Sequence, residues 1–424
     1  MPEPGSPAPL HLVSWKSSAV VSVAFVAMAA GFGQFGAVAA LGDVAKAFGH
    51  LSHGGTLADQ AGLSGTIVGV GLAVIRLASL GALFLTALAD RFGRRRVLLV
   101  TCAGGLVCTL VAAASPGYWW FVAIFALGRP LLSATNGVAQ VSAAELTGSK
   151  DRAKAVALIA AGYGVGAGLL AIVHSLGEGT LGFRGLFALV VVPLFALPLL
   201  SRRVVETDRF TTTAAREGRR PVFAWVARPY RRRLLIVGVL TFTIAVMTGP
   251  ANSFVFFYAQ NVRHLSGAVT AGMVAAGGVT GLGGLLAGRW LADHWGRRPT
   301  VALSMLAIAC AAILTYSGSD AALLCGYCLG VLSGSIFAPA GGALANEMFP
   351  TEVRASVAGW YVIAAVLGAV VGLLVFGAVA DIGNRFSVAA VVTFVPAVPF
   401  AALLLLLPET KGLEPEQLWG TGAG

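Results

Sequence analysis

Two arginines stand deep inside long runs of apolar residues. Arg76 lies about 13 residues from either end of its run, and Arg129 lies about 11 residues into another. At about 1.5 Å per helical residue, neither guanidinium can comfortably reach polar surroundings at the ends of its run. A charge at such a depth costs several kcal/mol unless it is paired. Each arginine should therefore have an anionic or strongly polar partner.

The sequence leaves the partner of these arginines open. No Asp or Glu lies deep in an apolar run of the first half, since Asp43 is toward the end of one run and Glu145 is at the end of another. A carboxylate or similar group of a bound solute is one possible partner. The alternatives are backbone carbonyls exposed at the many glycines, or Asp43 itself.

Other polar and aromatic residues in the apolar runs are candidates for lining a cavity. Pro250, within Thr248-Gly249-Pro250-Ala251-Asn252, is predicted to interrupt a helix because it frees a backbone carbonyl. A hinge or ordinary packing explains Pro250 and the aromatics after it equally well. The candidate cavity residues are Gln34, Arg76, Arg129, Ser133, Asn136, Gln140, Tyr163, Asn252, Phe256 and Tyr258.

A second set of charged residues is clustered and occurs twice. The segment Ala-Asp-Arg-Phe-Gly-Arg-Arg around Asp90 recurs as Ala-Asp-His-Trp-Gly-Arg-Arg around Asp293. Acids there can accept hydrogen bonds from arginines and from free N–H groups of a helix start, so each cluster can form a breakable latch. The alternative is that these residues stay solvated and only orient the chain. The candidate latch residues are Asp90, Arg91, Gly93, Arg94, Arg95, Glu145, Arg152 and Glu206, with Asp293, Gly296, Arg297, Arg298, Glu347, Arg354 and Glu409 in the second half.

The elements that carry these residues are predicted to be membrane-spanning helices. Of the 424 residues, 57% are hydrophobic and 11% are charged, whereas soluble domains carry roughly 25% charge. The apolar runs between charge clusters are each near the roughly 20 residues that cross a bilayer. The predicted spans are 18–47, 63–89, 97–115, 118–146, 153–174, 184–200, 232–260, 267–292, 299–317, 320–348, 354–380 and 386–407.

Charge asymmetry orients these spans in the cell membrane. With the N-terminus in the cytoplasm, 22 of the 29 Lys and Arg residues fall on the cytoplasmic side, so both termini are expected there. The predicted organisation is a cytoplasmic tail (1–17), a six-helix bundle (18–200), a cytoplasmic linker (201–231), a second six-helix bundle (232–407) and a cytoplasmic tail (408–424).

Several function classes are excluded. The net charge of +11 is explained by short basic loops, so nucleic-acid binding is not expected. The glycine-rich stretch 162–168 has no preceding strand, and close helix packing explains it better than dinucleotide binding. No nucleotide-binding loop, nucleophile with its base, or metal cluster is readable at membrane depth, so neither an enzyme nor a cofactor or metal is expected.

The repeat extends along the chain. Besides the segments around Asp90 and Asp293, offset by 203 residues, Glu145 and Arg152 recur as Glu347 and Arg354, and Glu206-Thr207 recurs as Glu409-Thr410. These offsets predict an all-α membrane protein made of two six-helix bundles related by pseudo-two-fold symmetry.

The quoted segments resemble motifs of the major facilitator superfamily. Residues 89–96 resemble its signature between the second and third helices, although Thr86 and Arg289 replace the glycine that usually begins it. Residues 347–354 and 407–412 are similar to those of sugar porters and their organic-ion relatives, and Arg129 resembles an arginine that the superfamily often carries. The resemblance implies that the charge clusters hold the cytoplasmic side shut when the cavity opens outward.

The resemblance and the arginines together predict a secondary transporter working by alternating access. Its partners would be a small organic anion or sugar-like metabolite, the lipid bilayer and, in a coupled mechanism, protons. We expect a monomer that mediates uptake. The alternative is a drug efflux antiporter, which the absence of a Gly-Pro pair from the fifth span disfavours. An embedded enzyme or scaffold is the rival class.

Overall fold

The computed structural model describes residues 12–50, 61–177, 181–207, 228–382 and 385–412. Within these ranges the chain is helical apart from connections and one isolated bridge between Val13 and Thr147. The helices of the first bundle are α1 (Ser18–Ala39), α2 (Leu41–Phe48), α4 (Gly65–Ala78), α5 (Gly81–Phe92), α6 (Arg94–Ala112), α7 (Tyr118–Leu146), α8 (Ser149–Leu176), α9 (Gly182–Ala188) and α10 (Val191–Ser201). Those of the second are α12 (Arg228–Phe257), α13 (Gly267–His294), α14 (Arg297–Thr315), α15 (Asp320–Glu347), α16 (Thr351–Asp381) and α17 (Phe386–Phe394).

Two segments of other helical geometry complete the second bundle. A π-helical segment, Tyr258–Val262, continues α12, and a 3₁₀ segment, Val395–Leu406, continues α17. Most of the predicted linker (208–227) and most of both predicted tails (1–11 and 413–424) lie outside the described residues.

Twelve helical stretches of the described chain are long and apolar enough to cross a membrane, six on each side of the linker. Eleven of them begin and end within three residues of the predicted spans. The prediction of an all-α protein with twelve spans is therefore confirmed, because long uncharged runs leave a helix as the structure that satisfies every backbone group in lipid.

The first span is shorter than predicted. It ends at Ala39, and a separate short helix, α2, follows from Leu41. The reason lies in a contact from the second bundle: the Asn261 side chain packs directly on Gly42, so closely that a Cβ there would collide with it. The predicted continuous helix to residue 47 was wrong because this contact is invisible to hydropathy.

The predicted interruption at Pro250 is also wrong. α12 runs unbroken through Pro250, and its irregular turn comes later, in the π-helical segment. The break occurs instead in the second span, between α4 and α5, where no proline is present. There the Ser79 hydroxyl donates a hydrogen bond to the Arg76 carbonyl, and Gly81 packs on Pro130 of α7.

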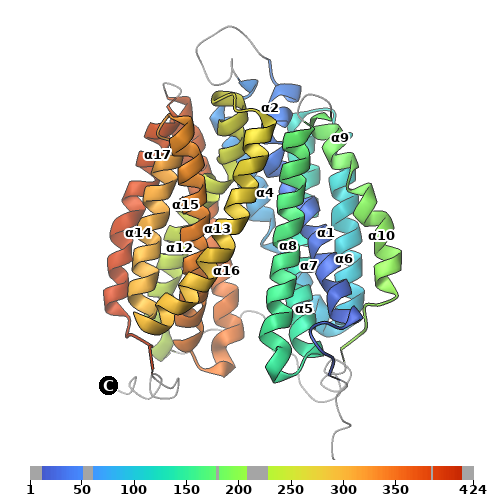
Figure 1. Cartoon of the computed structure of the whole chain (residues 1–424), viewed down its shortest axis with the longest axis vertical. Coiled ribbons are helices and arrows are strands. Elements are labelled where there is room, and N and C mark those ends of the chain that lie inside the picture. The colour runs from blue at the N-terminus through green and yellow to red at the C-terminus, as the bar shows by residue number, and fades with distance from the viewer. Residues whose placement is uncertain (1–11, 51–60, 178–180, 208–227, 383–384, 413–424) are drawn as a thin grey trace, which may run out of the picture.

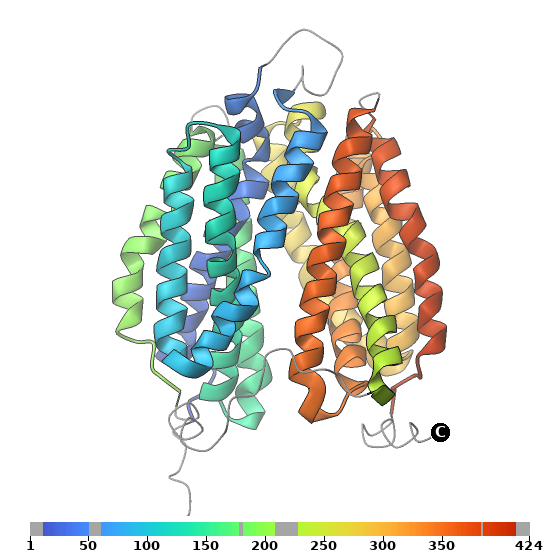
Figure 2. The same cartoon turned by 180° about the vertical axis from the view of Figure 1, so that it is seen from behind.

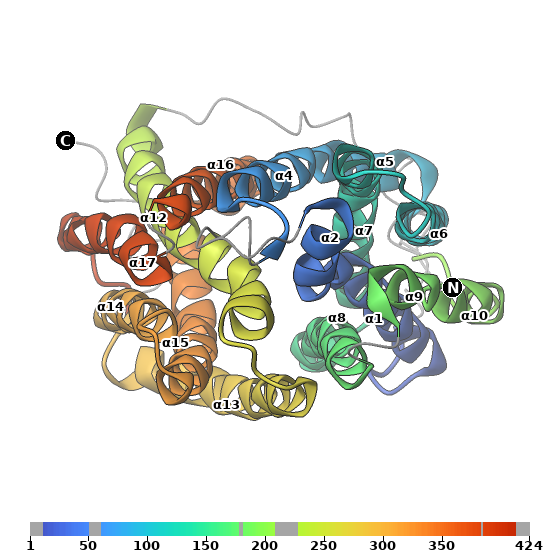
Figure 3. The same cartoon turned by 90° about the horizontal axis from the view of Figure 1, so that it is seen from above.

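The two bundles stand side by side and can be described by their two ends (Figures 1 and 2). We call the lower end in Figure 1 the basic end, because α6 and α14 begin there at Arg94 and Arg297; the opposite end is the far end. Viewed along the bundles, α4 lies beside α16, and α8 beside α13, across the boundary between the halves (Figure 3).

Glycines set the closest contacts within the first bundle. A Cβ on Gly31 of α1 would collide with the Tyr163 carbonyl of α8, and one on Gly166 of α8 would collide with the Met28 carbonyl of α1. The predicted packing role of the glycine-rich stretch 162–168 is thereby confirmed, since absent side chains let the two backbones approach. Thr86 stands where the motif usually has a glycine. The glycine at this contact is supplied by α7 instead, because a Cβ on Gly137 would lie 3.2 Å from Cγ2 of Thr86.

The contact between Gly166 and the Met28 carbonyl leads to a prediction about stability. Gly166→Ala should force α1 and α8 apart at the Met28 carbonyl, costing about 1–3 kcal/mol as overpacking does, and so lower the melting temperature by several degrees. Gly164→Ala is the matched control, because a Cβ at Gly164 meets nothing within 4 Å. Thermal unfolding of the purified proteins, followed by tryptophan fluorescence, measures both; equal melting temperatures would contradict the assigned contact.

Candidate functional site

Arg129 sits at the centre of a polar network in the first bundle. The Gln34 amide of α1 is best satisfied with its oxygen toward Arg129, from which it accepts hydrogen bonds of 3.0 to 3.2 Å. In that orientation its nitrogen donates to the Tyr163 hydroxyl at 3.0 Å, and its oxygen lies 3.3 Å from Ser133 Oγ. Gln34 is only 5% exposed, so Arg129 is held by neutral dipoles inside the bundle.

Arg76 brings a second positive charge to the same place. It lies in the last turn of α4, just before the break, near the Tyr163 hydroxyl and close enough to Arg129 for the two positive charges to repel each other. Its Nε is buried and has no hydrogen-bond partner among the described residues. Two like charges at membrane depth repel each other, so an anion between them would be strongly favoured.

Arg76 also borders a cavity of about 400 Å³, most of whose wall comes from the second bundle. Arg76 lines it together with Thr241 and Thr248 of α12, Phe337 of α15 and Tyr361 of α16. Sequence reasoning did not select Tyr361, whose hydroxyl is buried without a partner in the described structure. The sequence could have indicated Tyr361, because it places a hydroxyl group inside a largely apolar span. The cavity therefore offers a few polar atoms on an apolar wall, as small-molecule sites do.

The remaining cavity candidates are dispersed. Asn136 is half-buried, with an Oδ1 atom that has no partner among described groups, and Gln140 is half-buried one turn further along α7. Asn252 is exposed one turn beyond Thr248 on α12. None of the three lines the 400 Å³ cavity.

Phe256 and Tyr258 lie away from the arginine pair. Phe256 packs on Phe35 of α1, with ring centroids 5.7 Å apart, and so joins the two bundles. Tyr258 packs within the second bundle against Tyr316 and Phe386, with ring centroids 5.1 and 4.9 Å apart. Both rings are buried in packing, which follows from the α12 helix continuing past Pro250 instead of opening there.

Asp43 does not partner the arginines. Its Oδ2 lies 2.8 Å from Nε2 of His174, a side chain only 4% exposed at the end of α8. That alternative is therefore wrong, because Asp43 belongs to α2, which turns away from the first span at Ala40.

The charge cluster of the first bundle is closely bonded at the basic end. Arg94 lies 2.7 Å from Asp90 and 3.1 Å from Glu145. Glu206 accepts hydrogen bonds from the backbone N–H groups of Arg94 (2.8 Å) and Arg95 (3.2 Å), the first residues of α6. A carboxylate at a helix N-terminus satisfies free donors and complements the helix dipole.

The second bundle repeats this arrangement. Arg297 lies 3.9 Å from Asp293 and 3.4 Å from Glu347. Glu409 accepts from the N–H groups of Arg297 (2.8 Å) and Arg298 (3.0 Å) at the start of α14.

Glycine is required at the turn that precedes each of these helices. Gly93 has a φ of 96° and Gly296 a φ of 113°, a conformation that residues with a Cβ rarely adopt. A Cβ on Gly296 would also lie 2.8 Å from a Glu409 oxygen. The motif glycines are thus explained by the turn and by the approach of the capping carboxylate.

The other candidate latch residues contact their own bundle. Arg152 donates to the Ala144 carbonyl at 3.2 Å, and Arg354 to the Phe349 carbonyl at 3.0 Å. Arg91 stacks on Phe92 at 5.3 Å. The ion pairs of Arg94 with Asp90 and Glu145, and those of Arg297 with Asp293 and Glu347, each lie within one bundle. The latch across the two bundles remains a prediction for another conformation.

At the far end the bundles are joined. Asp381 of α16 accepts hydrogen bonds from the backbone N–H groups of Gly65 (2.6 Å) and Thr66 (2.9 Å) at the start of α4, and from the Thr66 hydroxyl. Beside this cap a Cβ on Gly69 would lie 3.3 Å from the Cα of Gly377, so the two helix backbones touch. The site is therefore closed toward the far end.

A family comparison decides what this two-bundle architecture is. The model described as Major Facilitator Superfamily matches residues 23–334 and 279–423. The chain belongs to the Major Facilitator Superfamily. Proteins of this superfamily that resemble it are transporters, and this chain is a membrane transporter rather than an enzyme.

Two curated superfamily relatives cover most of the chain. A Haemophilus influenzae protein described as a metabolite transport protein is 27% identical over 348 residues, 78% of this chain and 84% of its own length. A Cupriavidus pinatubonensis protein described as a 4-methylmuconolactone transporter is 27% identical over 378 residues, 84% of this chain and 85% of its own.

A solved superfamily structure confirms the fold. The inward-open conformation of the Escherichia coli xylose transporter XylE aligns with a TM-score of 0.74 at 17% identity, covering 95% of this chain and 98% of that one. The predicted resemblance to sugar and organic-ion transporters is thereby confirmed for the fold.

The closed far end makes a testable prediction. Gly168 of α8 faces Val274 of α13, with 3.9 Å between an added Cβ and the valine Cγ1. In a background without the five native cysteines, Gly168→Cys with Val274→Cys should form a disulfide across the bundles. With a protease site placed in the linker, cross-linked halves will migrate together on a denaturing gel.

The matched control is the pair Asp90→Cys with Asp293→Cys at the basic end. Both side chains are more than half exposed, at 73% and 55%, and they occupy equivalent positions in the two bundles. This pair should cross-link more slowly and less completely. Preferred cross-linking at the basic end would contradict the assigned conformation.

Proposed function

We propose that this transporter carries a small organic anion, such as a carboxylate, into the cell by alternating access. The observation that supports the proposal is that Arg76 lines the cavity close to Arg129, and that Arg129 donates its hydrogen bonds to the neutral Gln34 amide. A carboxylate bound there would supply the negative charge that no Asp or Glu within the spans of the first half supplies.

Desolvation makes the two buried guanidinium groups costly. A guanidinium removed from water loses several kcal/mol of hydration, and hydrogen bonds to an amide and a hydroxyl recover only part of it. A second guanidinium nearby adds repulsion. An anionic solute removes both costs at once, so it binds more favourably than an uncharged solute of the same shape.

The cavity walls support a solute with an apolar or lightly polar body. Leu240, Ile244 and Phe337 provide apolar surface, whereas Thr241 and Tyr361 provide hydroxyl groups. A sugar-like metabolite would need more hydrogen-bonding groups than this wall presents. The relative described as a 4-methylmuconolactone transporter agrees with an organic metabolite as cargo.

The orientation of the protein in the membrane determines to which side the site is closed. Lysine and arginine concentrate at the basic end, so we place that end and both termini in the cytoplasm of a cell-membrane protein. The conformation described here is then closed to the outside. Opening outward would require the bundles to meet at the basic end, where the latch residues lie. Whether a proton accompanies the anion is tested in the assay below.

The charge requirement is tested by uptake into proteoliposomes. A panel of organic acids is compared with the matching amides, with sugars and with cationic dyes, each with and without an imposed proton gradient. At least one acid should enter at least about tenfold faster than its amide, corresponding to about 1.4 kcal/mol of preference for the charge. Equal rates for each acid and its amide would remove the proposal, and a preferred dye would favour efflux.

Single substitutions then assign the preference to the arginines. Arg76→Gln and Arg129→Gln should each reduce uptake of the preferred acid by at least about tenfold, because each removes one charge-assisted pair. Arg289→Gln is the matched control, since Arg289 is exposed on α13 and lines neither the cavity nor the network. If all three variants transport the acid equally, the arginines do not select the solute.

A further inference from the structure

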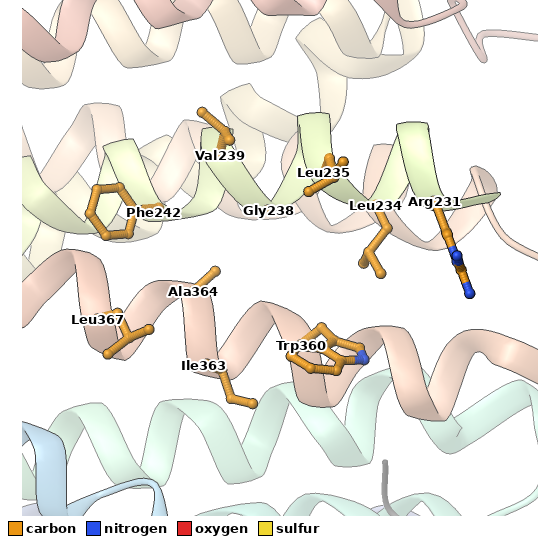
Figure 4. A pocket seen from close by; sticks show the side chains of 10 residues that line it. All are labelled: Arg231, Leu234, Leu235, Gly238, Val239, Phe242, Trp360, Ile363, Ala364 and Leu367. Carbon is orange, nitrogen blue, oxygen red and sulfur yellow. The ribbon is translucent and has the colours of Figure 1, made fainter. Parts of the chain in front are cut away.

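A second hollow lies on the outer side of the second bundle, between α12 and α16. The two helices touch where Gly368 meets the Phe242 carbonyl and diverge from there toward the basic end. The resulting groove has a volume of about 480 Å³ (Figure 4). Its lining is apolar except at one end, where Arg231 stands opposite Trp360.

This groove is separate from the transport cavity. Along α12, Leu234, Leu235 and Gly238 line the groove, whereas Val237, Thr241 and Thr248 line the cavity. Figure 2 shows α12 and α16 beside each other on the outside of the molecule. The two hollows are thus on different sides of the same helix pair.

The groove exposes apolar surface to the bilayer. Leu235 is 68% exposed, Leu367 42% and Trp360 36%. The groove is open beside Gly238, because a Cβ on this residue would meet no atom within 4 Å. In a membrane-spanning chain such a surface is in contact with acyl chains.

The dimensions match one leaflet. From Arg231 to Phe242 the groove follows eleven helical residues, about 16 Å. That is close to half of the hydrocarbon core, which is about 30 Å thick. Arg231 and its exposed neighbour Arg232 therefore reach headgroup level while Phe242 and Leu367 reach the bilayer middle. Trp360 takes the interfacial position that tryptophan prefers.

We propose that this groove is a binding site for an anionic phospholipid from the leaflet at the basic end. One acyl chain lies between α12 and α16, and the headgroup phosphate is held by Arg231. A hydrocarbon chain is thinner than a helix, which is about 10 Å across, and therefore suits a slot between two neighbouring helices. Adjacent arginines select an anionic over a zwitterionic headgroup, as basic pockets between membrane helices do.

Native mass spectrometry of the delipidated full-length protein tests the site. Phosphatidylglycerol and phosphatidylethanolamine with the same acyl chains are titrated separately. The wild-type protein should bind the first phosphatidylglycerol at least about fivefold more tightly than phosphatidylethanolamine. Arg231→Gln should abolish this preference and leave phosphatidylethanolamine binding unchanged.

A second variant tests the groove itself. Gly238→Leu fills the slot and should weaken the first binding step of both lipids by about tenfold, a loss expected for a buried hydrocarbon contact. Gly283→Leu is the matched control, because a Cβ at the exposed Gly283 of α13 also meets nothing within 4 Å. Arg289→Gln controls for loss of an arginine elsewhere.

Each outcome decides the proposal. Equal binding of the two lipids by the wild-type protein, or unchanged binding by Gly238→Leu, overturns it. A wild-type dimer that Gly238→Leu converts to monomers would assign the groove to a second copy of the chain instead. If Gly238→Leu does not fold, loss of lipid preference in Arg231→Gln, with Arg289→Gln unaffected, still supports the phospholipid site.

Discussion

The structure depends on one electrostatic constraint: two guanidinium groups are held at membrane depth without a carboxylate from the surrounding spans. The Gln34 amide, itself bonded to Ser133 and Tyr163, accepts hydrogen bonds from Arg129, and Arg76 faces the cavity from the last turn of α4. Because neutral groups only partly offset the cost of these charges, the anion that we propose as the solute would lower the energy of the site. The first bundle thus supplies charge, and the second supplies most of the cavity wall.

The polar bonds at the basic end lie within each bundle, whereas the contacts between the bundles lie toward the far end. At the basic end, a positive-φ glycine starts α6 and α14, and a distant glutamate caps each helix. These bonds close each bundle on itself. At the far end, the boundary includes the Asp381 cap and a glycine-lined contact between α4 and α16. Two bundles that are each bonded internally in this way are suited to rocking about a central site.

Sequence reasoning predicted features that follow from local composition or from the repeat. Hydropathy located the spans, since a long uninterrupted apolar run satisfies its own backbone groups in lipid by forming a helix. The 203-residue offset placed Glu206 and Glu409 in equivalent roles before any contact was known. Gln34 was selected as a cavity residue, yet its contact with Arg129 required the packing of α1 against α7 and α8.

The features that escaped prediction depend on contacts between distant segments. The α4–α5 break has no proline, and it arises where Gly81 packs on Pro130. The end of α1 depends on Asn261 from the other bundle, and the cavity role of Tyr361 depends on how α16 is rotated. The helix break predicted at Pro250 does not occur, because a helix packed against its neighbours can contain a proline without being interrupted.

The most direct measurement is an experimental structure of the transporter with its preferred anion bound, prepared with a bromine-labelled carboxylate so that the solute is located unambiguously. The account predicts that the carboxylate oxygens lie within about 3 Å of guanidinium nitrogens from both Arg76 and Arg129. A solute that binds in the cavity while contacting neither arginine would contradict it.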